Sequence, residues 1–360
     1  MSKKKTIVLV LAVMLILIGS LAGCAANDAP APAPAAPDSS APADTPAADT
    51  GGGYTFGYLA WALADEWNQY GNEAFIWCAD QDGVTVLTLD CKKDPETQVS
   101  QAEEFISKGV DAISIFPSTP EAAATIARMC NEAGIPLAIE NIFLPDDGSS
   151  GELVGQVACQ YGDIGYAAIQ YAATVHPGPP AQLLYVHGAP GMGVYEDYKI
   201  GVDRALAEYA DSIEMVGLIN GEWETEASFN VTMDFITSGQ SDFNVIFANN
   251  DMVAVGAFNA LKENDMVGIP IISTGGSLMG HDMIMDGRAY ANMTAPVNIQ
   301  GILLYQFLWK YLNGETIEQT KIPLPVIPVD ATNIDTDWIL WTDHAAANNY
   351  IKNNIPSMAR

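Results

Sequence analysis

The sequence predicts an α/β protein whose strands form mainly parallel sheets. From residue 54 onward, short apolar runs rich in β-branched and aromatic residues alternate with longer segments of helical periodicity. Apolar strands that alternate with helices are typical of βαβ units, in which helices cover both faces of a parallel sheet. Residues 54–360 are too many for one minimal core. They suit two lobes, each with a sheet of about five or six strands.

Capping and turn residues separate the predicted elements. Asp94 and Pro95 make a favourable helix start, since aspartate caps well and proline suits the first helical position. The predicted strands are 54–60, 84–90, 111–117, 135–141, 152–159, 182–188, 214–221, 244–248, 269–274 and 289–295. The predicted helices are 64–81, 95–108, 120–132, 162–175, 195–209, 224–238, 251–264, a short helix after 274, and 297–312.

The N-terminus predicts export. Three lysines precede an apolar run over 7–18, which is shorter than the about 20 residues that span a membrane. The sequence LAGC follows at 21–24 and resembles the bacterial lipobox. The resemblance implies a lipoprotein signal peptide at 1–23 and a lipid on Cys24 that tethers the protein to a membrane. The alternative is an uncleaved anchor.

Residues 24–53 are predicted to be an Ala/Pro-rich linker. Apart from Cys24, the segment contains only Ala, Pro, Asp, Asn, Ser, Thr and Gly. Such a segment cannot bury enough apolar area to offset the entropy lost on ordering. We expect a flexible spacer that holds the folded body away from the membrane.

Charge excludes several classes of partner. The chain has 44 acidic and 15 basic residues, which gives a formal net charge of −29. Nucleic acid requires a basic protein surface, and anionic lipid would repel this body. The acidic balance fits solubility outside the cell.

Four cysteines follow Cys24 in the chain. Cys78, Cys91, Cys130 and Cys159 form no CxxC pair, which argues against a zinc or redox motif. An exported location permits disulfides without requiring them. We expect buried free thiols, and the alternative to test is a bridge between Cys78 and Cys91.

One strand end indicates where a ligand would bind. The apolar run 245–248 stops at Asn249, Asn250 and Asp251, and helical spacing then resumes. Ligands of open α/β sheets bind beyond the carboxyl ends of strands, and an amide both donates and accepts hydrogen bonds. We predict that Asn250 faces a ligand and that Asp251 caps the next helix.

Several segments together resemble the ribose-binding-like periplasmic proteins, the type I periplasmic binding protein fold. IFANNDMVAVGAFNAL resembles that family's strand–Asn-Asp–helix segment, and 105–141 resembles its third strand, third helix and fourth strand. The resemblance covers about 54–325. It implies two Rossmann-like lobes, 54–158 plus 296–326 and 159–295 plus 327–360, joined by a three-crossing hinge near 158, 295 and 326. The ligand would bind between the lobes.

The resemblance also implies site residues. Trp67 and Trp223 match aromatic residues that contact the sugar, Asn250 matches a ligand-binding asparagine, and Glu140 matches an aspartate. Other positions depart from the family. Asn141 and Tyr198 replace arginines, Gly275 replaces an aspartate, and Ala295 or Thr294 replaces a glutamine.

These departures change the expected ligand chemistry. Arginine and aspartate provide the usual readout of sugar hydroxyls, and an anionic ligand would lack a counter-charge here. Aromatic faces would stack on a neutral sugar, a deoxysugar or a nucleoside. A cationic amine held by aromatic rings is the alternative. The predicted ligand-binding residues are Trp61, Trp67, Glu140, Asn141, Tyr195, Tyr198, Trp223, Asn250 and Thr294.

No motif indicates an enzyme. The chain contains no Gly-x-Ser-x-Gly elbow, P-loop or HExxH, and the glycines at 188–193 lack dinucleotide-binding spacing. No cofactor or metal is expected. The resemblance implies an extracytoplasmic, monomeric binding protein that delivers a neutral sugar to an ABC permease. A ligand sensor that signals to a membrane receptor is the alternative.

Overall fold

The structure is a computed structural model that describes residues 53–175, 180–239 and 242–359, all within the unit Thr50–Arg360. The predicted signal peptide, Cys24 and all of the linker except Gly53 lie outside the described residues. Among the described helices, none is both long and apolar enough to cross a bilayer.

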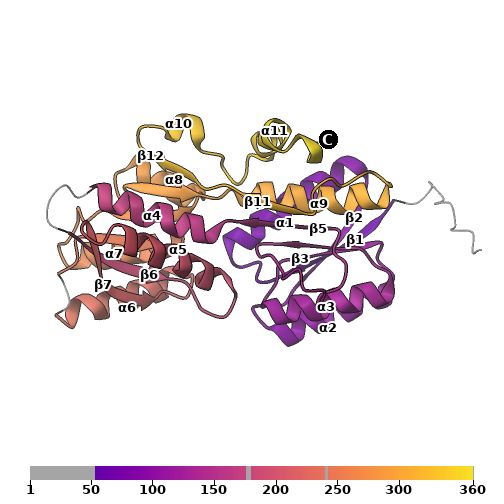
Figure 1. The fold of residues 1–360 in the computed structure, drawn as a ribbon, viewed down its shortest axis with the longest axis horizontal. Coiled ribbons are helices and arrows are strands. Elements are labelled where there is room, and N and C mark those ends of the chain that lie inside the picture. The colour runs from indigo at the N-terminus through magenta and orange to yellow at the C-terminus, as the bar shows by residue number, and fades with distance from the viewer. Residues whose placement is uncertain (1–52, 176–179, 240–241, 360) are drawn as a thin grey trace, which may run out of the picture. The chain divides into compact units, whose positions relative to one another are not determined.

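Two six-stranded sheets form the body, as predicted (Figure 1). The first has the order β11-β5-β4-β3-β1-β2 and is parallel throughout. The second has the order β12-β10-β9-β8-β6-β7, and only β12 runs antiparallel to its neighbour. The strands are β1 Thr55–Ala60, β2 Thr85–Asp90, β3 Ala112–Ile115, β4 Leu137–Glu140, β5 Gly155–Cys159, β6 Ala181–His187, β7 Ile213–Asn220, β8 Val245–Ala248, β9 Ile271–Gly275, β10 Ala291–Thr294, β11 Lys321–Leu324 and β12 Ile327–Asp330.

Helices pack in pairs against these sheets. In the first lobe α1 packs with α9 and α2 with α3, and in the second α4 packs with α5 and α6 with α7. The helices are α1 Glu66–Asp82, α2 Pro95–Lys108, α3 Pro120–Ala133, α4 Tyr161–Val175, α5 Val194–Glu208, α6 Thr225–Thr237, α7 Asp251–Glu263, α8 Leu278–Met285, α9 Val297–Leu312, α10 Ile334–Asp337, α11 His344–Asn354 and the 3₁₀ helix η1 Pro356–Met358.

The chain passes between the two sheets three times. It leaves the first sheet after β5, returns after β10, and crosses again between β11 and β12. The connecting residues are Gln160, Ala295–Pro296 and Pro325–Val326, which lie beside the predicted crossings. This topology confirms the predicted fold class.

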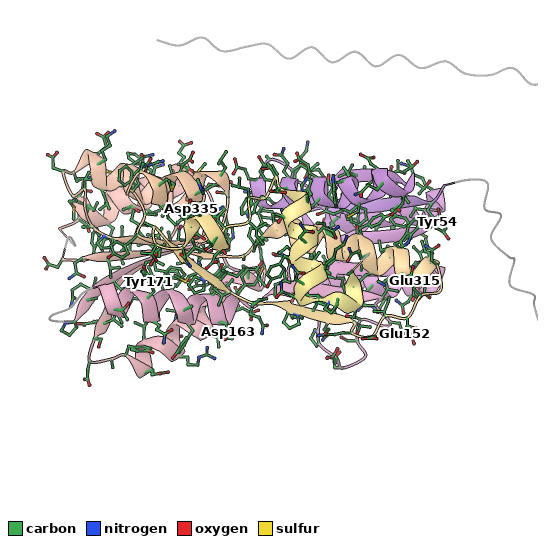
Figure 2. The ribbon with its side chains drawn as sticks, turned by 90° about the horizontal axis from the view of Figure 1, so that it is seen from above. Tyr54, Glu152, Asp163, Tyr171, Glu315 and Asp335 are labelled. Carbon is green, nitrogen blue, oxygen red and sulfur yellow. The ribbon has the colours of Figure 1, made fainter. Side chains whose placement is uncertain are left out.

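The C-terminal segment corrects the predicted division of the lobes. All of 327–360 was expected in the second lobe, and α10 does pack on β12 there. However, α11 and η1 pack on α9 of the first lobe. Helix α9 is apolar on nearly every face because α1, α11 and the strands of the first sheet enclose it. In Figure 2, Asp335 of α10 and Tyr171 of α4 lie in one lobe, and Tyr54 and Glu315 lie in the other.

The cysteines are buried in this core. Cys91, Cys130 and Cys159 are free thiols, as predicted, so the alternative bridge between Cys78 and Cys91 is not formed. The Cys91 thiol donates to the carbonyl oxygen of Trp61 at 3.3 Å. Burial raises the pKa of the Cys91 thiol to about 11, which keeps it protonated and unreactive at neutral pH.

Candidate functional site

A cavity lies between the carboxyl ends of the two sheets, and both lobes line it. Trp61, which follows β1, and Trp67, in the first turn of α1, come from the first lobe. Trp223, before α6, and Asn250, before α7, come from the second. The cavity encloses about 640 Å³ of space between atoms, part of it open to solvent.

Six of the nine predicted ligand-binding residues line this cavity, namely Trp61, Trp67, Asn141, Tyr198, Trp223 and Asn250. The other three lie elsewhere. Glu140 is completely buried behind the cavity wall, Tyr195 stacks on His187 with ring centroids 4.2 Å apart, and the Thr294 hydroxyl donates to the carbonyl oxygen of Ile327. Ligand contact by the nine residues stays a prediction.

Asn250 caps α7 instead of Asp251, which corrects the predicted cap, and Asn250 also lines the cavity. Asn250 is the N-cap of α7, and its side-chain oxygen accepts from the backbone N–H of Val253 at 2.7 Å. Asp251 turns inward instead, and its buried carboxylate accepts hydrogen bonds from the loop that follows β9. Both residue types cap helices well, so local sequence does not decide between them. The backbone N–H groups of Gly276 and Ser277 hold Asp251 inside.

Trp223 is held in an unusual backbone conformation. The backbone N–H of Glu224 donates to the carbonyl oxygen of Gly221 at 2.9 Å, which closes a tight turn. Glu222 and Trp223, its two central residues, have φ values of 55° and 64°, which a bulky side chain rarely adopts. Such backbone strain, of order 1–3 kcal/mol, is often found at functional sites. The turn places the Trp223 ring directly over Gly188.

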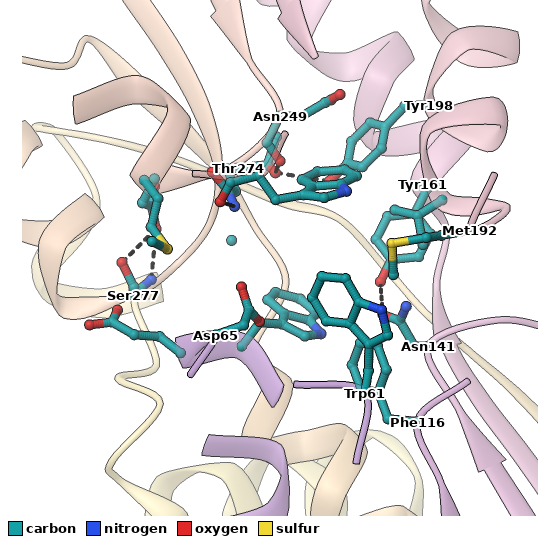
Figure 3. Close-up of a pocket in the computed structure, with 18 of the residues that line it drawn as sticks. Trp61, Asp65, Phe116, Asn141, Tyr161, Met192, Tyr198, Asn249, Thr274 and Ser277 are labelled. Atoms are coloured by element: carbon teal, nitrogen blue, oxygen red, sulfur yellow. Dashed lines mark hydrogen bonds between the residues drawn. The ribbon is translucent and has the colours of Figure 1, made fainter. Parts of the chain in front are cut away.

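Two tyrosines line the cavity at or beside the positions where the resembling family has arginines: Tyr198 stands at one position, and Tyr161 lies beside Asn141 at the other. The Tyr161 hydroxyl donates to the side-chain oxygen of Asn141, and the Tyr198 and Thr274 hydroxyls lie 2.8 Å apart. Figure 3 shows Tyr198, Asn249 and Thr274 on one side of the cavity and Trp61, Phe116 and Asp65 on the other. Among the described residues, no arginine or lysine lines the cavity.

Sequence reasoning missed several residues that line the cavity. Asn249 and Phe116 both follow strands directly, so the strand-end rule alone could have included them. Asp65 also lines the cavity, two residues before the predicted Trp67. Trp341 had no local signal, since it lies in an irregular stretch after α10. Its indole N–H donates to the carbonyl oxygen of Gly275 at 3.2 Å.

A buried carboxyl group lies behind the cavity near the hinge. Glu140 accepts a hydrogen bond from the Tyr58 hydroxyl, and its second oxygen has no partner. Burial raises the pKa of Glu140 from the 4.5 of an exposed glutamate to about 8. The folded protein therefore holds this proton over a pH range in which the unfolded chain releases it.

Replacing Glu140 with glutamine is expected to reduce the loss of stability that the wild type shows as pH rises. In the wild type, the protonated Glu140 side chain contributes to stability in full below its unfolded-state pKa of 4.5. This contribution is lost as pH rises through its folded-state pKa of about 8. The variant should therefore gain unfolding free energy relative to wild type between about pH 5 and about pH 9. Urea unfolding at both pH values measures this difference, with the exposed Glu132→Gln as control. An equal difference in unfolding free energy between Glu140→Gln and wild type at both pH values would contradict the raised pKa of Glu140.

The site offers no evident metal centre. Within the described ranges, His, Cys, Asp and Glu side chains form no cluster of three or more that could hold a metal ion. Burial lowers the pKa of His187, whose ring nitrogen lies 2.6 Å from the carbonyl oxygen of Gly188. The arrangement is that of an enclosed binding cavity between two lobes.

Comparisons with curated proteins identify relatives. The ribose import binding protein of Salmonella typhimurium is 24% identical over 246 residues, which are 68% of this chain and 80% of the relative. The xylitol-binding protein of Mycolicibacterium smegmatis is 26% identical over 217 residues, which are 60% of either chain.

Solved structures share the fold. An ABC transporter solute-binding protein from Bacillus halodurans with bound myo-inositol superposes with a TM-score of 0.73 at 22% identity, covering 80% of this chain and 98% of that one. A periplasmic solute-binding protein from Actinobacillus succinogenes with bound D-allose gives a TM-score of 0.72 at 23% identity, covering 78% and 99%. The profile of the periplasmic binding protein domain matches residues 56–316. This chain belongs to the periplasmic binding protein domain family.

Proposed function

We propose that this protein is the extracytoplasmic solute-binding component of an ABC importer. It captures a small neutral polar ligand, a sugar or sugar-like compound, between two lobes that close around it. The observation that carries the proposal is the cavity that both lobes line, with Trp67 on one side and Trp223 on the other. A ligand that contacts both indoles stabilises the closed arrangement, because only that arrangement offers both contacts.

The ligand is proposed to be uncharged. Asp65 and Glu66 line the cavity, and no described arginine or lysine does, so an anion would meet carboxylates without a counter-charge. The relatives named for ribose and xylitol and the neighbours with bound myo-inositol and D-allose support a neutral polar compound.

Anchoring and partners complete the proposal. Cleavage before Cys24 and a lipid on that cysteine would tether the monomeric body outside the cell, and the linker would give it reach. The partner would be the ABC permease in the same membrane. Chemical transformation of the ligand is not part of the proposed role.

A thermal-shift screen tests the proposal. The panel holds neutral sugars, nucleosides, quaternary amines and amino acids. A ligand at about 1,000 times its dissociation constant should add about 4 kcal/mol to the free energy of unfolding. A clear rise in melting temperature with a neutral sugar or nucleoside is the expected result. A folded protein that no compound in the panel stabilises would contradict the proposed function.

Replacing Asn250 with alanine is expected to lower ligand affinity about tenfold, because its amide also donates to the carbonyl oxygen of Trp223 and holds that turn in place. The substitution also removes a helix cap, which costs about 1 kcal/mol of stability. Thr119→Ala is the matched control, since Thr119 caps α3 away from the cavity. Calorimetric titration should show weak binding only for Asn250→Ala. Equal ligand affinity in Asn250→Ala and Thr119→Ala would show that Asn250 does not contribute to binding.

A further inference from the structure

The hydrogen-bonding groups that the cavity leaves unpartnered are donors. The indole N–H groups of Trp67 and Trp223 and the side-chain amide nitrogen of Asn249 are buried and have no partner within the protein. Trp223 is 9% exposed and Asn249 is 1% exposed. A buried donor without a partner is costly, so a ligand that fills this cavity gains by presenting acceptors.

The orientation of the Asn249 amide is fixed by its neighbours. Its side-chain oxygen accepts from the Tyr185 hydroxyl at 2.9 Å and from the backbone N–H of Gly188 at 3.2 Å. A backbone N–H can only donate, so the oxygen must face Gly188 and the NH₂ group must face away from it. The NH₂ group of Asn249, a residue of the cavity wall, is thus left without a partner within the protein.

Several acceptors along the cavity wall already accept a hydrogen bond from within the protein. The side-chain oxygens of Asn141 and Asn250 already accept from Tyr161 and Val253. Both carboxylate oxygens of Asp251 accept hydrogen bonds from neighbouring loops and strands. The hydroxyl groups of the wall already donate their hydrogens within the protein, namely those of Tyr161, Tyr198, Thr274 and Ser277.

Asp65 and Glu66 offer carboxylate acceptors to a ligand, and the Tyr161 and Tyr198 hydroxyls, which donate within the protein, keep acceptor lone pairs. One Asp65 oxygen caps α1, and the carboxyl group turns toward the middle of the cavity (Figure 3). A polyol brings one hydroxyl hydrogen for every hydroxyl oxygen, and each hydrogen needs an acceptor. The buried groups of this wall that lack a partner are all donors, so the wall favours a ligand with many acceptors and few donors.

The remaining wall is aromatic. Four indoles line the cavity, those of Trp61, Trp67, Trp223 and Trp341, and Phe116 stacks on Trp61 with centroids 6.2 Å apart. The Trp67 and Trp341 rings meet edge to face at 5.3 Å. Rings from both lobes thus offer flat apolar faces, which stack best on another flat ring.

We propose that the cavity binds a flat, uncharged nitrogen heterocycle of the nucleobase type, either free or carried on a sugar as a nucleoside. Ring nitrogens and carbonyl oxygens accept from Trp67, Trp223 and Asn249, and a ring N–H donates to Asp65. The ring faces stack on the indoles. The proposal rests on the proposed function for the role of the cavity, and within the small neutral polar ligands it prefers this heterocycle to a sugar.

Competing ligand classes fit less well. A quaternary amine has no acceptor and would leave three buried donors unpaired. An anion would face Asp65 and Glu66 without a cation, because the nearby Lys93 pairs with Glu224 at 2.6 Å. Lys93 lies 5.2 Å from the centroid of the Trp61 ring and is not part of the cavity wall.

Calorimetric titration of the purified full-length protein tests this ligand class. The probes are hypoxanthine, inosine, ribose, myo-inositol and choline. The expected result is that hypoxanthine or inosine binds at least about tenfold more tightly than the other three probes. Tighter binding of inosine identifies the nucleoside as the ligand source, and tighter binding of hypoxanthine identifies the free base.

The other outcomes overturn the proposal. If ribose or myo-inositol binds more tightly than both heterocycles, the heterocycle is wrong and the proposed solute-binding function stands. If choline binds more tightly than both heterocycles, the unpartnered N–H donors do not determine which ligand binds. If no probe binds to the folded protein, both this proposal and the proposed function fail.

A matched pair of variants tests the role of the unpartnered donors. Trp223→Phe keeps an aromatic ring and removes the N–H, so affinity for the heterocycle should fall about fivefold or more. Trp338→Phe is the control, since the Trp338 N–H is also buried and unpartnered but lies outside the cavity wall. Unchanged heterocycle affinity in Trp223→Phe would overturn the donor-based readout.

Discussion

Replacing Asp251 with alanine is expected to remove at least about 3 kcal/mol of unfolding free energy. One carboxylate oxygen accepts from the Ser273 hydroxyl at 3.0 Å and from the Asn292 amide at 2.5 Å. The other accepts from the backbone N–H groups of Gly276 and Ser277 and from the Ser277 hydroxyl. The substitution leaves these buried donors without a partner, and each carries a desolvation cost.

The same carboxylate organises the floor of the cavity. It joins α7 to β9, β10 and the loop before α8, and α8 packs so closely that a Cβ on Gly280 would lie 2.4 Å from an Asp251 oxygen. Burial raises the pKa of Asp251 to about 6 in spite of these hydrogen bonds. Because this network supports the cavity floor, Asp251→Ala should lower ligand affinity as well as stability.

Denaturant unfolding measures the loss, and Asp203→Ala is its control. Asp203 is exposed and pairs only with Lys199 one helical turn away, so its removal should change stability by no more than about 0.5 kcal/mol. If Asp251→Ala were as stable as Asp203→Ala, the hydrogen-bond network around Asp251 would not be the support assigned to it.

Replacing Gly188 with alanine is expected to lower ligand affinity at least about a hundredfold, because a Cβ at this position would lie 2.0 Å from the Trp223 ring. No heavy atom can remain at that distance, so the indole must leave its place in the cavity wall. The substitution adds a single methyl group at a position that does not itself line the cavity. Affinity titration of the variant measures the effect.

A double-mutant cycle separates this clash from other effects of the methyl group. In a Trp223→Ala background there is no ring to displace, so Gly188→Ala should add little further loss of affinity. If the affinity losses of Gly188→Ala and Trp223→Ala are fully additive in the double variant, Gly188 acts through the strand or the Asn249 hydrogen bond rather than through Trp223.

The fold was predictable from the sequence wherever strand and helix patterns were long. Strands β11 and β12 were missed, and both contain a proline, Pro323 and Pro328. Proline argues against a strand unless the strand lies at a sheet edge, and both of these strands are edge strands. Edge position is a property of the tertiary fold, which a local pattern does not contain.

Residues of the candidate site were predictable from the sequence where they lie just beyond the end of a strand. Trp61, Asn141 and Asn250 follow strand ends, and all three line the cavity. Glu140 is the last residue of its strand, yet its side chain faces Tyr58 in the core, because alternate residues of a strand point to opposite faces. Trp341 reaches the cavity only through the path of the C-terminal segment, so no local pattern could have placed it there.

The most direct test of a ligand held between two lobes is the affinity of one ligand for one variant in each lobe. Trp67→Ala alters the first lobe and Trp223→Ala alters the second, and both side chains line the cavity. Calorimetric titration with the tightest ligand from the screen should show affinity reduced about tenfold or more in each variant, with both proteins still folded. Full affinity in either variant would mean that one lobe alone holds the ligand, and it would contradict capture between the lobes.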